Sequence, residues 1–216
     1  TDNEWVLANP EVADFIFEHP CLYTDAQTPP LLVDGKGAVH RWDGTRWQVL
    51  VNVGAGSDVC YGMSNPRSDE TWVLCARRMY RVSLTERRVT DTLDTPPVNG
   101  RPYLYLGPTG RLFICDDSQV QEYHGGRWYV LRTNPEDQVD SMLEDPSGTL
   151  WVIWGGLCER LTPRGWVRVA VAGEDRASSP VECMTACDDG SLLFAVAGEG
   201  VYRLQDGRFT RLMSYA

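Results

Sequence analysis

The side chains that most often carry enzyme chemistry are present, but they do not form a recognised motif. The sequence contains no G-x-S-x-G, H-E-x-x-H, Walker or G-x-G-x-x-G pattern. Its three histidines, His19, His40 and His124, lie far apart, and the last two stand beside Trp42 and Tyr123. Histidines in such strand-like runs are expected at the surface or at a sheet edge. The sequence therefore predicts no metal site.

Cysteine is another common nucleophile and metal ligand, and the chain has seven cysteines. No C-x-x-C pair occurs, which argues against a zinc knuckle or a thioredoxin-like site. Cys183 and Cys187 share a predicted strand, where they lie too far apart to bond to each other. Most of the cysteines lie in apolar strand runs, so we expect buried free thiols. Free thiols favour a cytoplasmic location, with the periplasm or the extracellular space as the alternative. The cysteines are Cys21, Cys60, Cys75, Cys115, Cys158, Cys183 and Cys187.

Carboxylates are abundant, but most stand in predicted turns, where an aspartate accepts hydrogen bonds from its own backbone. A glycoside hydrolase would need a pair of carboxylates on strands that face a common cavity. Only Asp140, Glu144, Glu182 and Asp188 stand where such a pair would be required. The connecting loops are short for an enclosed active site. We therefore expect a protein that is not an enzyme and has no cofactor, and keep a hydrolase as the least favoured alternative.

These residues are positioned by a repeated unit that is clearest between Leu143 and Leu161. Its Pro and Gly residues are typical of turns, and a short run of β-branched and aromatic residues between turns is typical of a buried strand. A more polar third strand and an alternating outer strand complete four antiparallel strands. In order, the segments are the inner strand 139–143, the turn 145–148, the buried strand 149–154, the turn 155–156, the third strand 157–161 and the outer strand 166–169.

The same pattern returns about every 40 residues along the chain, as expected for propeller blades. The predicted fold is all-β: one five-bladed β-propeller over residues 19–216, made of four-stranded antiparallel blades. Residues 1–18 precede it as a short helical or extended capping segment. A β-sandwich with accidental spacing is the alternative. The predicted blades are 20–51, 59–93, 103–132, 139–171 and 181–212; the second-strand positions are Leu32, Trp72, Phe113, Trp151 and Leu193, and the outer-strand positions are Trp47, Val89, Trp128, Trp166 and Phe209.

Composition limits the classes of partner. The net charge is −10, from 30 acidic and 20 basic residues, and Lys36 is the only lysine. An acidic chain with scattered arginines lacks the basic stripe that nucleic acids and anionic membranes require. No apolar run approaches the roughly 20 residues that span a bilayer. We expect no nucleic-acid partner and no membrane insertion.

The run from Glu144 to Leu161, EDPSGTLWVIWGGLCERL, resembles the two-component regulator propeller repeat. Weaker resemblance covers residues 104–123 and 184–204, through Thr109–Phe113 and Asp188–Leu204. The motif residues of that family are structural. The resemblance implies a ligand-sensing or protein-binding module of a larger signalling protein, mostly outside the inner membrane. That location disagrees with the one that the cysteines suggest.

A binding surface is expected at the turns between the second and third strand of each blade, because loops on a rigid scaffold often carry function. We call these the central turns. Trp154 stands at one of them, where an aromatic ring could stack on a sugar or anchor a peptide; the alternative is that it closes over the channel. The predicted function is a binding or scaffold module with another protein as partner. A small-ligand or glycan-binding, lectin-like propeller is the alternative. The candidate binding residues are Trp154, Arg77, Arg78, Asp116, Asp117 and Glu199.

Overall fold

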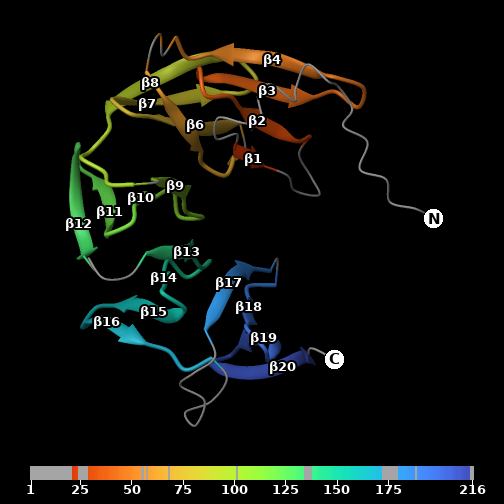
Figure 1. The fold of residues 1–216 in the computed structure, drawn as a ribbon, viewed down its shortest axis with the longest axis vertical. Coiled ribbons are helices and arrows are strands. Elements are labelled where there is room, and N and C mark those ends of the chain that lie inside the picture. Colours follow the sequence, from red (N-terminus) through yellow and green to blue (C-terminus); the bar gives the residue numbers. More distant parts are fainter. Residues whose placement is uncertain are drawn as a thin grey trace. The chain divides into compact units, whose positions relative to one another are not determined.

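The computed structural model describes residues 21–23, 29–54, 56, 58–67, 69–100, 102–133, 138–171, 180–187 and 189–214. Its described residues form β-strands and turns without a helix, and the strands β1 to β20 group into four-stranded antiparallel sheets (Figure 1). The chain divides into two compact units, residues 1–106 and 107–216, which are described separately. The predicted capping segment, residues 1–18, lies outside the described residues.

The first unit holds two complete sheets and the first strand of a third. Each strand pairs with the strand that follows it in sequence, so each sheet is a simple meander. Sheet 1 contains β1 (Cys21–Tyr23), β2 (Leu31–Val33), β3 (Ala38–Trp42) and β4 (Trp47–Asn52). Sheet 2 contains β5 (Cys60–Met63), β6 (Glu70–Cys75), β7 (Arg78–Ser83) and β8 (Arg88–Asp94), and β9 (Tyr103–Leu106) begins sheet 3.

The second unit completes sheet 3 and adds two more meanders. Sheet 3 continues with β10 (Leu112–Cys115), β11 (Gln119–His124) and β12 (Arg127–Thr133). Sheet 4 contains β13 (Val139–Glu144), β14 (Leu150–Trp154), β15 (Leu157–Thr162) and β16 (Gly165–Arg168). Sheet 5 contains β17 (Val181–Ala186), β18 (Leu192–Val196), β19 (Gly200–Gln205) and β20 (Arg208–Ser214).

The structure confirms the predicted fold class, an all-β chain of five four-stranded antiparallel sheets. The repeat extends to irregularities of the backbone. The pairing of first and second strands shifts register at the same place in three sheets, beside Cys60, Val139 and Val181. A β-bulge has no reason to recur at equivalent positions unless the units are built alike. The second strands β10 and β14 are buried at every residue, as their short apolar sequences predict.

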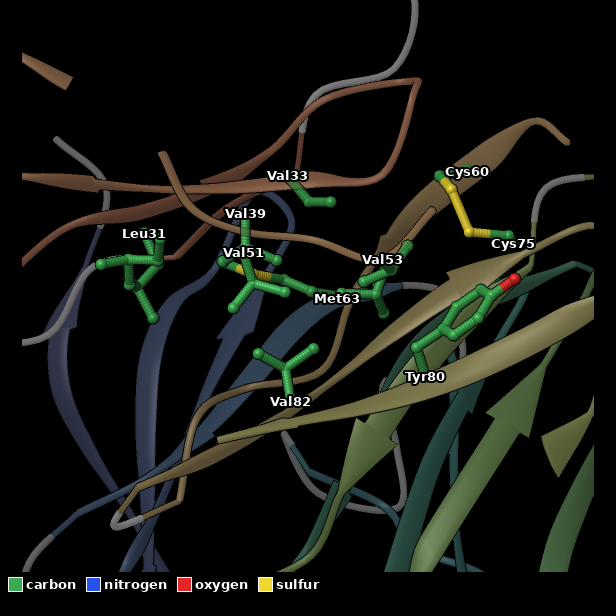
Figure 2. Packing of buried hydrophobic residues seen from close by; sticks show 12 residues of the cluster. Leu31, Val33, Val39, Val51, Val53, Cys60, Met63, Cys75, Tyr80 and Val82 are labelled. Carbon is green, nitrogen blue, oxygen red and sulfur yellow. A yellow bond between two sulfur atoms is a disulfide. The ribbon is translucent and has the colours of Figure 1, made fainter. Parts of the chain in front are cut away.

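The core of the first unit lies between sheets 1 and 2 and contradicts one prediction. Leu31, Val33 and Val39 pack with Val73 and other side chains of sheet 2 (Figure 2). Within this cluster, Cys60 and Cys75 form a disulfide. The prediction of free thiols throughout was wrong, because it did not consider that β5 and β6 place these two residues directly opposite each other. Cys158 is a free and buried thiol, as predicted, and Cys115 is also buried.

Candidate functional site

Two of the central turns are held by a buried aspartate. In sheet 1, Asp34 Oδ1 accepts hydrogen bonds from the backbone N–H groups of Lys36 and Ala38, both at 2.9 Å. Its other oxygen lies 3.1 Å from His40 Nε2. In sheet 3, Asp116 accepts from the N–H groups of Ser118 and Gln119, at 2.8 and 2.9 Å. These carboxylates hold the turns rather than face solvent.

The central turns also bind the next sheet along the chain. The carbonyl of Gly35 accepts a hydrogen bond from Cys60 N at 3.2 Å, and the carbonyl of Gly156 accepts one from Val181 N at 2.8 Å. Gly156 has a φ of +81°, and a Cβ on it would lie 2.3 Å from the Cβ of Pro180. Only glycine allows this approach. These two central turns therefore lie beside the start of the next inner strand.

The structure separates the predicted binding residues into two groups. Asp116, Trp154 and Glu199 are buried, with 2%, 2% and 6% of their surface exposed. The ring of Trp154 therefore offers no open surface on which a ligand could stack, and its Nε1 has no hydrogen-bond partner within the described residues. Glu199 accepts a hydrogen bond from the Tyr202 hydroxyl at 3.3 Å and lies 3.9 Å from Arg211 Nη1.

Arg77, Arg78 and Asp117 are exposed at the tips of their turns. Arg77 and Arg78 belong to the first unit, and the remaining candidate residues belong to the second. Neither arginine side chain makes an ion pair with any part of the chain that the structure describes. An exposed guanidinium without a partner is available to bind a carboxylate or phosphate.

The backbone that carries these arginines is firmly bound on both sides. Ala76 N donates to the carbonyl of Val59 at 2.8 Å, and Arg77 N donates to Asp58 Oδ2 at 3.0 Å. On the other side, Thr95 N donates to the carbonyl of Arg77 at 3.0 Å, and Thr95 Oγ1 donates to the carbonyl of Cys75 at 2.8 Å. Asp58 and Thr95 were missed at the sequence level, since they lie 19 and 18 residues from Arg77.

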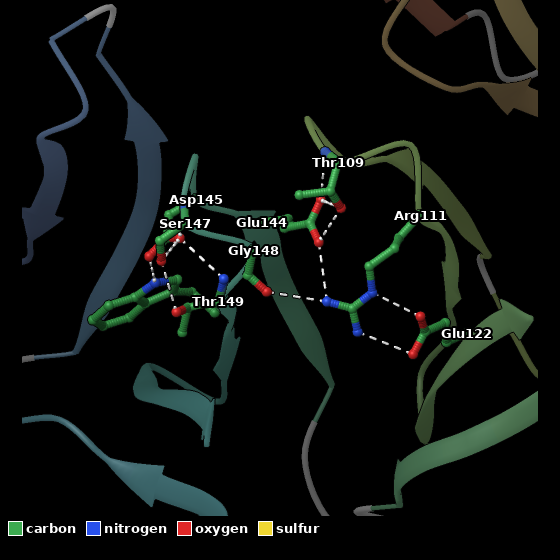
Figure 3. A network of polar contacts seen from close by, with 9 residues as sticks. Thr109, Arg111, Glu122, Glu144, Asp145, Ser147, Gly148 and Thr149 are labelled. Atoms are coloured by element: carbon green, nitrogen blue, oxygen red, sulfur yellow. Dashed lines mark hydrogen bonds and ion pairs between the residues drawn. The ribbon is translucent and has the colours of Figure 1, made fainter. Parts of the chain in front are cut away.

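Glu144, one of the four carboxylates named for a hydrolase, is fully buried and accepts hydrogen bonds from several donors (Figure 3). Thr109 N donates to it at 3.1 Å, Thr109 Oγ1 at 2.7 Å and Arg111 Nη1 at 3.0 Å. Arg111 also forms a bidentate pair with Glu122, at 2.7 and 3.0 Å, and these neighbouring carboxylates raise the pKa of its guanidinium. Gly107 leaves room for this arrangement, because a Cβ there would lie 2.0 Å from Glu144 Oε2. The network joins residues of sheets 3 and 4 and leaves no oxygen for a substrate.

The two other described carboxylates named for a hydrolase lie in different surroundings. Asp140 accepts a hydrogen bond from Gly156 N at 2.9 Å, and Glu182 is exposed on β17. Asp188 lies outside the described residues. No three His, Cys, Asp or Glu side chains among the described residues form a metal-binding group. His40 was predicted at the surface or at an edge, but it is buried beside Asp34.

The free thiols differ in their exposure. Burial, with a smaller contribution from Glu159, raises the pKa of Cys158 to about 12, so this thiol is protonated and unreactive at neutral pH. Cys183 is exposed on β17. No helix among the described residues has the length and apolar composition needed to cross a membrane.

Known proteins resemble this chain in fold but not in sequence. No family model matches it, and a search of curated proteins finds no match. Among solved structures, virginiamycin B lyase from Staphylococcus aureus is 14% identical with a TM-score of 0.63, and the match covers 90% of this chain and 70% of the lyase. The extracellular domain of BT4673 from B. thetaiotaomicron, described as a one-component system, is 15% identical with a TM-score of 0.59. That match covers 90% of this chain but only 28% of BT4673.

Two further solved structures match this chain at a similar level of identity. YCF48 bound to D1 peptide is 15% identical with a TM-score of 0.59, over 91% of this chain and 68% of that one. The WD40 β-propeller domain of Doa1 is 12% identical with a TM-score of 0.56, over 88% of this chain and 62% of that one. At these identities the matches show the fold alone. The chain has the fold of β-propeller blades.

Proposed function

We propose that this protein is a non-catalytic binding module whose partner is another protein, contacted through the central turns. Its buried carboxylates support this proposal, because Asp34, Asp116 and Glu144 are occupied by hydrogen bonds that hold the fold. The buried thiol of Cys158 is unsuited to act as a nucleophile at neutral pH. A rigid scaffold with exposed, charged turn tips is better suited to recognition than to catalysis.

The observation that carries the proposal is the turn of sheet 2. It presents the exposed guanidinium groups of Arg77 and Arg78 on a backbone that four hydrogen bonds fix in place. A fixed turn loses little conformational entropy on binding, so its contacts contribute more fully to affinity. Two adjacent cations select an acidic segment, most readily one that offers Asp or Glu carboxylates.

We further propose that the module acts outside the cytoplasm, as a sensory or interaction part of a larger signalling protein. The Cys60–Cys75 disulfide supports this location, since disulfides persist in oxidising compartments. The similarity of residues 144–161 to two-component regulator propeller repeats and the extracellular match to BT4673 agree with it. The match to a peptide-bound YCF48 supports a peptide segment as the element recognised.

A glycan or small-molecule site is the less favoured proposal. It would need equivalent side chains at equivalent turns, but the turns of sheets 2, 3 and 4 differ: they present Arg77 and Arg78, Asp117, and two glycines. The aromatic residue that could stack on a sugar, Trp154, is buried.

Affinity capture from an extract of the native host tests the proposed function. Arg77→Ala/Arg78→Ala should lose a protein that the unaltered chain retains. Arg87→Ala/Arg88→Ala is the matched control, because this exposed arginine pair lies in the same sheet at the opposite end of β7 and β8. Equal retention by both variants would exclude the sheet 2 turn as the binding element.

A further inference from the structure

The disulfide occupies a position that is filled differently in other sheets. Cys60 and Cys75 are opposite each other at the end of β5 and β6 that lies next to the central turn. The equivalent pairs are Val139 with Trp154 in sheet 4 and Val181 with Val196 in sheet 5. Those sheets use large apolar side chains at this position. Sheet 2 instead uses two small side chains joined by a covalent bond.

This bond lies at the base of the Arg77–Arg78 turn. Cys75 immediately precedes Ala76, and its carbonyl accepts the hydrogen bond from Thr95 Oγ1. Cys60 follows Asp58 and Val59, the two residues that accept hydrogen bonds from Arg77 N and Ala76 N. The disulfide therefore joins the strand that leads into the turn to the segment that supplies two of the turn's acceptors.

Apart from its hydrogen bonds to Ala76 and Arg77 and the bond from Cys60 N to Gly35, this segment depends on the pairing of β5 with β6. The strand β5 is only four residues long, is interrupted by a register shift between Cys60 and Gly62, and is half-buried at its centre. The acceptors Asp58 and Val59 precede the strand, and Val59 is 52% exposed. Short, interrupted and partly exposed pairing is the kind that opens locally at low cost.

We propose that the Cys60–Cys75 disulfide is the positioning element of the Arg77–Arg78 turn, and that its reduction releases the turn and weakens binding of an acidic partner segment. The positioning role stands on the geometry of sheet 2 alone, while the effect on binding rests on the proposed function. Reduction transfers two electrons and two protons from a dithiol, which becomes a disulfide, and leaves two protein thiols in place of the S–S bond.

The physical reason is the loss of a covalent constraint that the two remaining cysteine side chains do not replace by packing. The bond closes a loop with a sequence separation of 15 residues, and opening it returns conformational freedom to that loop. The two cysteines left behind bury less apolar surface than the valine–tryptophan pair of sheet 4. The segment 58–60 then separates more easily from β6 and takes with it the acceptors of the turn.

Hydrogen exchange tests the positioning role, and sheet 4 supplies an internal control. Its turn is fastened in the same way, with Gly155 N bonded to Gln138 O and Gly156 N bonded to Asp140, but without a disulfide. Treating the protein with a dithiol reductant should accelerate amide hydrogen exchange of Ala76 and Arg77 by about 100-fold at most. Exchange of Gly155 and Gly156 should change less than about threefold. Unchanged exchange at Ala76 and Arg77, or equal acceleration in both turns, would overturn the proposal.

Two variants separate the bond from the side chains. Cys60→Ser/Cys75→Ser should behave like the reduced protein under all conditions. Cys60→Val/Cys75→Val installs the pair that sheet 5 uses at Val181 and Val196, and should restore protection of the turn irrespective of the reductant. If the serine variant does not fold, the reduced unaltered protein provides the same comparison. A valine variant with the rapid exchange of the reduced protein would overturn the view that the disulfide replaces a packed pair.

Binding is measured separately with a fluorescent oligoglutamate peptide as the probe. Reduction should lower its affinity about tenfold in the unaltered protein and leave that of the valine variant unchanged. The turn could loosen on reduction while the peptide affinity stays constant. That result would overturn the effect on binding and the proposed function of the arginines, but it would leave the positioning role standing. Loss of affinity without any loosening of the turn would overturn the positioning role.

Discussion

Replacing Glu144 with alanine gives the sharpest separation between a structural and a catalytic carboxylate. The substitution leaves the N–H and hydroxyl of Thr109 without their acceptor and removes one of the two carboxylates that hold Arg111. The variant should fold less stably. The size of the loss can be worked out from the three contacts.

Thr109 is exposed, and losing the two hydrogen bonds from its N–H and hydroxyl costs about 1–3 kcal/mol in total, at roughly 0.5–1.5 kcal/mol each. The Arg111 side chain is 31% exposed and retains Glu122, so its lost ion pair adds at most about 1 kcal/mol after screening by solvent. Loss of the buried methylene groups adds about 1 kcal/mol, partly offset because a fully desolvated carboxylate is removed. The net effect is about 2–4 kcal/mol, which in a chain of 216 residues corresponds to a Tm lower by roughly 5–15 °C.

Thermal and urea unfolding followed by circular dichroism measure this loss. Glu182→Ala is the control, since Glu182 is an exposed carboxylate on the first strand of sheet 5 and should change stability by no more than about 0.5 kcal/mol. A Glu144→Ala protein as stable as the control would refute the reasoning. It would show that the donors around Glu144 do not need its carboxylate and would return this residue to the candidates for chemistry.

Two further predictions concern the turns. The backbone of Arg46, followed by the side chain and backbone of Thr45, donates hydrogen bonds that lower the pKa of Asp43 from 3.8 to about 2. Because this pKa is depressed in the folded state, the ionised carboxylate stabilises the hairpin above pH 3.8. That stabilisation disappears as the pH falls towards 2. Asp43→Asn should flatten the dependence of Tm on pH in this window, and an unaltered pH profile would contradict the assignment. Gly156→Ala should destabilise the protein by at least about 1 kcal/mol more than Gly126→Ala: both glycines have φ near +82°, but only Gly156 faces another residue at contact distance. Urea unfolding of the two variants measures the difference, and equal losses would mean that the close approach to Pro180 is unimportant.

The repeat was predictable because it depends on short local sequence patterns. Turn residues and short apolar runs recur with one spacing, and the positions of Trp72, Phe113 and Trp151 place the second strand of each unit. The chain therefore revealed five sheets, their strand order and the location of the central turns without any knowledge of contacts between the sheets.

The polar contacts of the candidate site were harder to predict from the sequence. Glu144 follows an apolar strand, which suggested an inner carboxylate, but its partners Thr109 and Arg111 lie 35 and 33 residues away. The Cys60–Cys75 bond depends on the pairing register of β5 and β6, and a one-residue shift would place the two sulfurs on opposite faces. Likewise, the type of a turn residue does not reveal its burial: Asp116 and Asp117 are neighbours, yet one holds the turn and the other is exposed.

The central claim is that the Arg77–Arg78 turn contacts a protein partner. Titration calorimetry with the captured partner measures this most directly, comparing the unaltered chain, Arg77→Ala/Arg78→Ala and Arg87→Ala/Arg88→Ala. The account predicts that the first pair of substitutions weakens binding at least about tenfold, while the second changes the Kd by less than about twofold. Equal affinities for all three proteins would contradict it.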